Sequence, residues 1–201
     1  MGAKLTMLFN LIRNWVAKTA AVAGAQPAPV EPRVVGLDAA EPLRHARALS
    51  EAGNVAAARR IYEEVLRRDR ENSEAQYYLG VLLGRTGRLA AASELLQQVV
   101  TKEPQFTGAL NALGNVRRLQ GQPTDAEGYY RRVLAIEAGT ASVWVNLGLC
   151  LRDSGRNQDA VDALQRALQL RPDEPDAIVN LALVRNDLGE SAEAQALLCR
   201  A

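Results

Sequence analysis

The sequence has few of the residues that catalytic and metal-binding sites most often use. Its 201 residues include one histidine, His45, and two cysteines, Cys150 and Cys199. Each cysteine lies in an apolar helical pattern without a second metal-type ligand nearby, so we expect two buried, reduced thiols. One histidine and two cysteines are too few to favour a zinc site or a Ser/His/Asp relay. We therefore expect no metal, no cofactor and no catalytic residue.

Aromatic residues and net charge are also scarce. Only 4% of the residues are aromatic, whereas 48% are hydrophobic and 23% are charged. Strands favour aromatic and β-branched residues, so this composition predicts an all-α protein. The 24 Lys and Arg residues balance 23 Asp and Glu residues, which leaves a formal net charge of +1. Because no overall field attracts nucleic acid, we expect no nucleic-acid partner.

A strict internal period is the main feature that the sequence does contain. Five glycines follow one another at intervals of 34 residues, and an alanine stands five residues after each. The glycines are Gly53, Gly87, Gly121, Gly155 and Gly189, and the alanines are Ala58, Ala92, Ala126, Ala160 and Ala194. A fixed period of this length is typical of helical repeats, which bury a core between neighbours and leave one concave face free.

The period divides the chain into frames of 34 residues. The frames are 39–72, 73–106, 107–140, 141–174 and an incomplete frame, 175–201. In each frame apolar residues recur at helical spacing before the glycine and again after it. This pattern predicts two helices joined by a tight turn, with the glycine in the left-handed conformation. The alanine is expected to let the two helices approach closely, and Pro104 and Pro172 to end second helices.

With these positions set out, the chain resembles the tetratricopeptide repeat (TPR) family. The fourth frame carries most of the family pattern, in Trp144, Leu147, Gly148, Gly155, Ala160, Leu164, Ala167 and Pro172. The second frame matches through Leu79, Gly80 and Pro104, and the third through Leu113, Gly114 and Tyr130. The first frame is weaker, because Pro42 and His45 stand where Trp and Leu are usual. The resemblance implies a right-handed superhelical array of antiparallel helix pairs with about five repeats.

The resemblance also implies which residues face the groove. In this family the first helix of each pair lines the inner surface. The corresponding residues are Tyr77, Val81, Arg85, Asn111, Asn115, Arg118, Val145, Asn146, Leu149, Arg152, Val179, Asn180, Leu183 and Asn186. Asparagine amides can donate to and accept from a peptide main chain, and arginine can bind a carboxylate. The alternatives are that Asn146 and Asn180 bridge or cap helices, and that the arginines form a solvated face.

One specific activity of the family does not fit these residues. The dicarboxylate clamp of chaperone-binding members requires three cations. Asn111, Asp176 and Asn180 stand at those positions across frames three to five. Because Asp176 would repel a carboxylate, we reject the clamp.

The segment ahead of the repeats predicts a cationic amphipathic helix over residues 1–23. The residues on its apolar side are Leu5, Leu8, Phe9, Ile12, Trp15 and Val16. Residues 1–30 contain three basic residues and no acid, so this helix suits the surface of an anionic membrane. The alternatives are a secretory signal, an N-myristoylation site at Met1-Gly2, and a helix that packs on the repeats or on another subunit. Residues 24–38 carry Pro27, Pro29 and Pro32 and are typical of an extended linker.

These patterns favour a non-catalytic scaffold that binds a protein or peptide in its groove. We expect it to be cytoplasmic and peripheral to a membrane; the alternative is export. A second functional hypothesis is that the repeats recruit substrates for a larger enzyme of glycosyltransferase or methyltransferase type that continues beyond residue 201. The apolar Leu197 and Leu198 near the end of the last frame also suggest a homo-oligomer formed through an uncapped repeat.

Overall fold

The computed structural model describes residues 39–199, and every regular element within them is an α-helix. The segment 1–23 and the linker 24–38 lie outside these residues. The first helices of the pairs are α2 (Ala40–Glu51), α4 (Ser73–Arg85), α6 (Thr107–Leu119), α8 (Ala141–Asp153) and α10 (Pro175–Asp187). The second helices are α3 (Val55–Arg68), α5 (Leu89–Lys102), α7 (Pro123–Ile136), α9 (Asn157–Leu170) and α11 (Ser191–Leu198). Each pair therefore occupies one of the frames that the glycines define.

The same turn closes all five pairs. Gly155 has a φ of +74°, and the other four glycines of the period have φ values between +75° and +85°. The residue after the glycine donates its backbone N–H to the carbonyl five residues earlier, as Arg156 does to Leu151 at 2.9 Å. This is the hydrogen bond of a Schellman helix end, which favours glycine because a Cβ is unfavourable at positive φ. The expected role of the glycine is confirmed.

The two helices of a pair approach closely, as the alanine column predicts. Ala160 on α9 is fully buried, as are its counterparts in the three preceding pairs. Gly148 on α8 lies so close to α9 that a Cβ there would stand 2.6 Å from Cγ of Leu164. Small residues at these two positions therefore allow the close packing that joins the helices into one unit.

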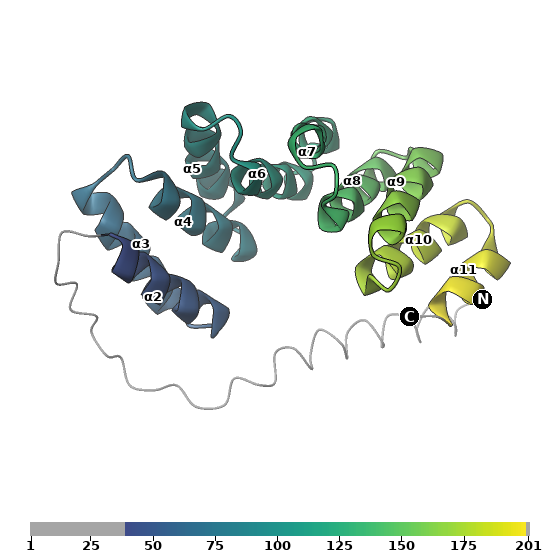
Figure 1. The fold of residues 1–201 in the computed structure, drawn as a ribbon, viewed down its shortest axis with the longest axis horizontal. Coiled ribbons are helices and arrows are strands. Elements are labelled where there is room, and N and C mark those ends of the chain that lie inside the picture. Colours follow the sequence, from purple (N-terminus) through teal and green to yellow (C-terminus); the bar gives the residue numbers. More distant parts are fainter. Residues whose placement is uncertain (1–38, 200–201) are drawn as a thin grey trace.

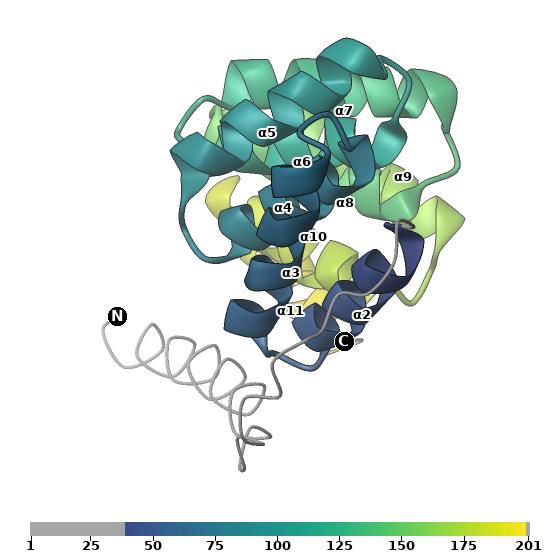
Figure 2. The ribbon, with the colours of Figure 1, turned by 90° about the vertical axis from the view of Figure 1, so that its left-hand side faces the viewer.

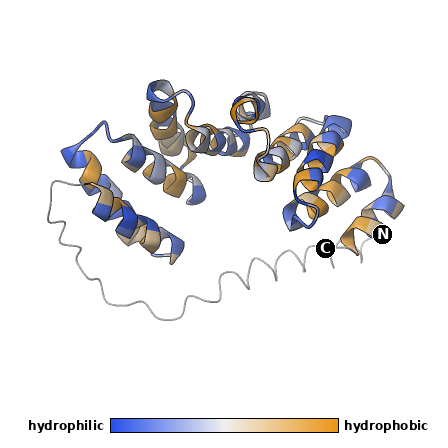
Figure 3. Ribbon diagram, in the orientation of Figure 1, coloured by the Kyte–Doolittle hydropathy of each residue, from blue (hydrophilic) through white to orange (hydrophobic). Residues whose placement is uncertain are grey.

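The pairs follow one another along an arch (Figure 1), which Figure 2 shows from its left-hand end. Each first helix contacts the first helix of the next pair, from α2 to α10. Within residues 39–199 the backbones of the second helices do not approach one another. A side-chain hydrogen bond from Tyr129 on α7 to Gln97 on α5, at 3.0 Å, bridges one of these gaps. The second helices are thus spread apart on the outside, and the first helices line the concave face. Figure 3 shows hydrophilic residues gathered at the turns and helix ends, with hydrophobic residues along the helices.

The two cysteines have different environments, which corrects one expectation. Cys150 is buried on α8 and its Sγ donates to the backbone carbonyl of Pro123 at 2.8 Å. Cys199 is exposed, although its sequence pattern predicts burial. It follows Leu198, the last residue of α11, and no later element among the described residues packs over it.

No helix among residues 39–199 combines the length and the apolar character needed to cross a membrane.

Candidate functional site

The residues predicted to face the groove all lie on first helices, from α4 to α10. Most of them are half-buried or exposed, as residues of a binding face must be. Val179 is 39% exposed, whereas Val145 on α8 is only 6% exposed. Val145 therefore packs in the core and presents little surface to a ligand.

Two asparagines join neighbouring repeats on this face. The Nδ2 of Asn146 on α8 donates to the Oδ1 of Asn111 on α6 at 3.0 Å. This bond leaves the Oδ1 of Asn146 and the Nδ2 of Asn111 without a partner among the described residues. Because each amide has both a donor and an acceptor side, the pair holds one acceptor and one donor group available on the concave face.

Two further asparagines are oriented in the same way by one internal bond each. Asn115 accepts a hydrogen bond from the hydroxyl of Tyr130 at 2.8 Å. Burial raises the pKa of Tyr130 against the opposing effect of Arg118, so this hydroxyl keeps its proton and donates it. The Nδ2 of Asn180 donates to the backbone carbonyl of Asp176 at 2.7 Å. One group of each asparagine amide, either its donor or its acceptor, is thus bonded within the protein. The other group has no partner among the described residues.

Arginines on the concave face form ion pairs between repeats. Arg118 on α6 lies 2.9 Å from Asp153 on α8, and Arg152 on α8 lies 2.6 Å from Asp187 on α10. Burial alone would lower the pKa of Arg118, but the hydrogen bond and charge of Asp153 raise it overall. These two cations are therefore neutralised within the protein and are poor candidates for binding a ligand carboxylate.

An aromatic cluster borders the groove at its second repeat. The ring centroid of Tyr77 lies 5.0 Å from that of Tyr78 and 4.8 Å from that of Phe106, with tilted planes. Tyr78 also stacks on Tyr62 at 5.9 Å. Such contacts hold Tyr77 half-buried in one orientation, so it offers a rigid surface to a ligand.

The outer side of the arch carries a second feature, which the sequence reasoning missed. A groove of about 490 Å³ lies between α7 and α9, with Trp144, Leu147 and Leu151 of α8 among its lining residues. At 100° per residue these residues lie, on average, about 160° around α8 from Asn146, Leu149 and Asp153, and so face away from the concave side. Ala163 of α9 also lines this groove. The positions equivalent to Ala163, at intervals of 34 residues, hold larger side chains in the other four repeats. They are Ile61, Leu95, Tyr129 and Leu197.

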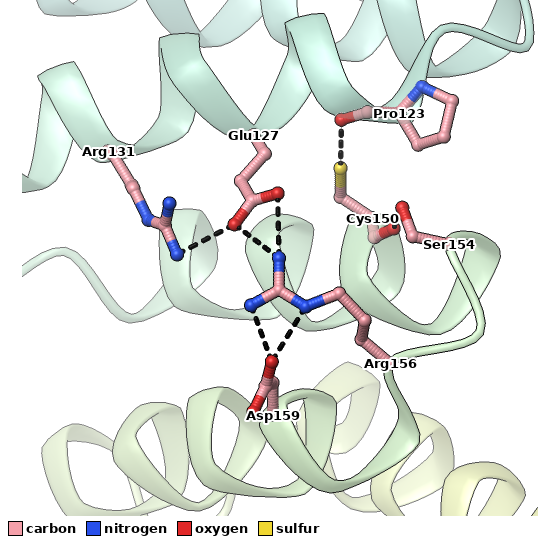
Figure 4. Close-up of polar contacts among 7 residues, drawn as sticks. All are labelled: Pro123, Glu127, Arg131, Cys150, Ser154, Arg156 and Asp159. Carbon is pink, nitrogen blue, oxygen red and sulfur yellow. Dashed lines mark hydrogen bonds and ion pairs between the residues drawn. The ribbon is translucent and has the colours of Figure 1, made fainter.

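A buried carboxylate supports the wall of this outer groove (Figure 4). Glu127 on α7 is 8% exposed and receives Nη1 of Arg156 at 2.9 and 3.0 Å. Arg131 adds an ion pair to Glu127 at 2.7 Å, and Arg156 also binds Asp159 at 2.7 Å. The network ties the turn before α9 to α7, so its role in the structure is to join two repeats. Aligning the frames column by column would have revealed both Ala163 and Glu127.

The described part of the chain contains no group of three or more His, Cys, Asp or Glu residues that could hold a metal ion.

Comparison with protein-family models matches the chain to the tetratricopeptide repeat. The matched segments are 43–105, 82–142, 111–175 and 151–201. A comparison with curated protein sequences found no match.

Solved structures of several repeat proteins are similar. MamA of Desulfovibrio magneticus RS-1 has a TM-score of 0.72 at 21% identity, covering 82% of this chain and 93% of that chain. A thermophilic TPR protein of Thermus thermophilus has a TM-score of 0.70 at 23% identity, covering 82% and 90%. YrrB, described as a TPR protein with an unusual peptide-binding site, has a TM-score of 0.64 at 20% identity, covering 81% and 84%. These likenesses confirm the expected all-α array of helix pairs.

Proposed function

Because the chain belongs to the tetratricopeptide repeat family, we propose that it is a non-catalytic scaffold whose concave face binds an extended peptide segment of a partner protein. The observation that carries this proposal is the pair Asn111 and Asn146. The bond between them fixes both amides and leaves one donor and one acceptor free on the same face. A peptide main chain offers the complementary groups at each residue, so it suits such a site without a fixed side-chain sequence.

Three other observations support the same surface. Asn115 and Asn180 have one free amide side each, so polar groups continue on either side of the pair. Tyr77 on α4 and Val179 on α10 add apolar surface toward the two ends of this face. YrrB, which shares the fold, is described as having a peptide-binding site. A single extended peptide on a face of this kind is expected to bind in the micromolar range, about −8 kcal/mol.

A selection from a phage-displayed library of random 12-residue peptides tests the proposal. The immobilised chain should enrich peptides that the double variant Asn111→Ala, Asn146→Ala no longer retains. A matched variant, Asn157→Ala together with Gln158→Ala at the start of α9, should retain them. Loss of peptide binding with an unchanged melting temperature supports the proposal. Failure of the unmodified chain to enrich any peptide would overturn it.

We also propose that residues 1–23 recruit the scaffold to an anionic membrane surface. The support is the sequence itself, with Phe9 and Trp15 on the apolar side and only basic charges elsewhere. The variant Phe9→Glu, Trp15→Glu should no longer bind vesicles of phosphatidylserine and phosphatidylcholine. The matched variant Thr6→Glu, Asn10→Glu adds the same charge to the polar side. If both variants lose binding equally, charge alone decides and an inserted apolar face is excluded.

A further inference from the structure

Among residues 39–199 the concave face has a similar polar contact at three of its four junctions between repeats. At these junctions a residue near the end of one first helix contacts the residue 35 positions later, at the end of the next first helix. This contact is Ser50 with Arg85, at 3.4 Å, between α2 and α4. It is Arg118 with Asp153, at 2.9 Å, between α6 and α8, and Arg152 with Asp187, at 2.6 Å, between α8 and α10. Three of the four junctions are therefore closed by a polar contact within the protein.

The fourth junction, between α4 and α6, differs from the other three. The same spacing pairs Gly84 with Leu119, neither of which has a polar side chain. Leu119 is 56% exposed, more than any other large hydrophobic residue among residues 39–199. A Cβ at Gly84 would stand 3.2 Å from Cγ2 of Val116, one helical turn before Leu119. The glycine therefore lets α4 approach α6 closely and leaves the side of Leu119 uncovered.

A cation without a carboxylate lies beside this junction. Arg85 is exposed and contacts only the hydroxyl of Ser50, at 3.4 Å. Unlike Arg118 and Arg152, it has no carboxylate within ion-pair distance among the described residues. Since a guanidinium binds a carboxylate through charge-assisted hydrogen bonds, Arg85 can add such a bond without breaking an existing ion pair.

We infer that the junction between α4 and α6 determines which peptide the concave face selects. The selected segment places an apolar side chain on Leu119, above Gly84, and an aspartate or glutamate next to it on Arg85. This inference rests on the proposed peptide-binding function. The junctions closed by Arg118 with Asp153 and by Arg152 with Asp187 contribute little to selection, because a ligand would have to break their ion pairs.

The charge of Arg85 favours this ligand over residues 1–30 of the same chain. Residues 1–30 contain Lys4, Arg13 and Lys18 but no acid, so they offer Arg85 repulsion and no carboxylate. A partner segment that combines an acidic and an apolar residue is complementary to both Arg85 and Leu119. We therefore assign this site to an acidic-apolar segment of a partner protein and not to the cationic residues 1–30.

The library of random 12-residue peptides also tests this inference. Peptides enriched by the unmodified chain should contain Asp or Glu beside Leu, Ile or Phe. In the best such peptide, changing the acid to its amide should weaken binding to the unmodified chain about tenfold, the usual size of a charge-assisted bond. The same change should have no effect with the variant Arg85→Gln. The control Arg166→Gln, on the outer helix α9, should behave as the unmodified chain does.

Each outcome has a separate meaning. Enrichment without an acidic preference, or the same preference with Arg85→Gln, overturns this inference but leaves peptide binding intact. Failure to enrich any peptide overturns the proposed function as well. A synthetic peptide of residues 1–23 that competes with the enriched peptide for the groove would overturn the argument from charge. The variant Leu119→Gln should remove the preference for the apolar neighbour and keep the preference for the acid.

Discussion

Arg118 on α6 and Asp153 on α8 form an ion pair across a repeat junction, with Nη1 2.9 Å from Oδ2. The side chains are 24% and 42% exposed. One repeat later Arg152 and Asp187 form the same pair. The same polar contact therefore joins neighbouring first helices at two successive junctions of the concave face.

Breaking this pair should cost little stability. In a double-mutant cycle with Arg118→Gln and Asp153→Asn, we expect a coupling of about 0.2–1 kcal/mol, since water screens partly exposed charges. Denaturation at low and high salt measures it, and the coupling should fall at high salt. A coupling several times larger, or one that salt leaves unchanged, would contradict the description of a screened pair.

The buried Glu127 should respond asymmetrically to the loss of its partners. Replacing both Arg131 and Arg156 with Gln leaves a buried carboxylate without an opposite charge, and should destabilise the protein by about 3 kcal/mol. Replacing Glu127 with Gln leaves two partly exposed arginines that water can solvate, and should cost about 1 kcal/mol. Urea denaturation of the three proteins measures both values. Equal costs would show that the network does not depend on burial of Glu127.

Two alanines on α9 should tolerate enlargement differently. Ala163 borders the outer groove, so Ala163→Leu, which introduces the residue found one repeat later at Leu197, should fill space and stabilise the protein by about 0.5–2 kcal/mol. Ala160 packs against α8 with no exposed surface, so Ala160→Leu should cost about 1–3 kcal/mol. Thermal unfolding distinguishes the two, and a loss of stability in both variants would mean that the groove cannot accept a side chain.

Two glycines with open surroundings should also respond in opposite directions. A Cβ at Gly128 or at Gly155 would meet no atom within 4 Å. Gly128 lies inside α7, so Gly128→Ala should stabilise the protein by about 0.5–1 kcal/mol. Gly155 has a φ of +74°, so Gly155→Ala should cost about 1–2 kcal/mol. Because neither change creates a steric contact, melting temperatures report the backbone effect alone.

The two thiols should react at very different rates. Burial raises the pKa of Cys150 to about 11, whereas Cys199 is exposed. At pH 8 only about 0.1% of Cys150 is the reactive thiolate, so a disulfide reagent should modify one thiol rapidly and the second only after unfolding. Cys199→Ser should abolish the rapid reaction. A rapid reaction that persists in this variant would show that Cys150 is accessible.

The raised pKa of Cys150 also determines how the stability of the protein changes with pH. Between the ordinary pKa of a thiol, about 9, and the raised value of about 11, the folded chain holds a proton that the unfolded chain has released. Stability should therefore fall as pH rises through this window. In Cys150→Ala this part of the decline should be absent, which denaturation at pH 8 and pH 10 can measure.

The sequence by itself determined the helix pairs and their period. These features depend on local rules: a glycine at positive φ ends the first helix, small residues at Ala160 and Gly148 allow close packing, and apolar residues at helical spacing form the core. Local rules of this kind act within about one repeat. They can therefore be inferred from residue type and spacing alone.

Only the tertiary structure decided which side chains of the concave face are free. Arg85, Arg118 and Arg152 are equivalent as residue types, yet Arg118 and Arg152 each meet a carboxylate on the next helix and Arg85 does not. Similarly, Val145 is buried and Cys199 is exposed despite their patterns. The reason is that burial and pairing depend on how one helix is rotated and spaced against its neighbour, and this geometry is set by packing across the whole junction.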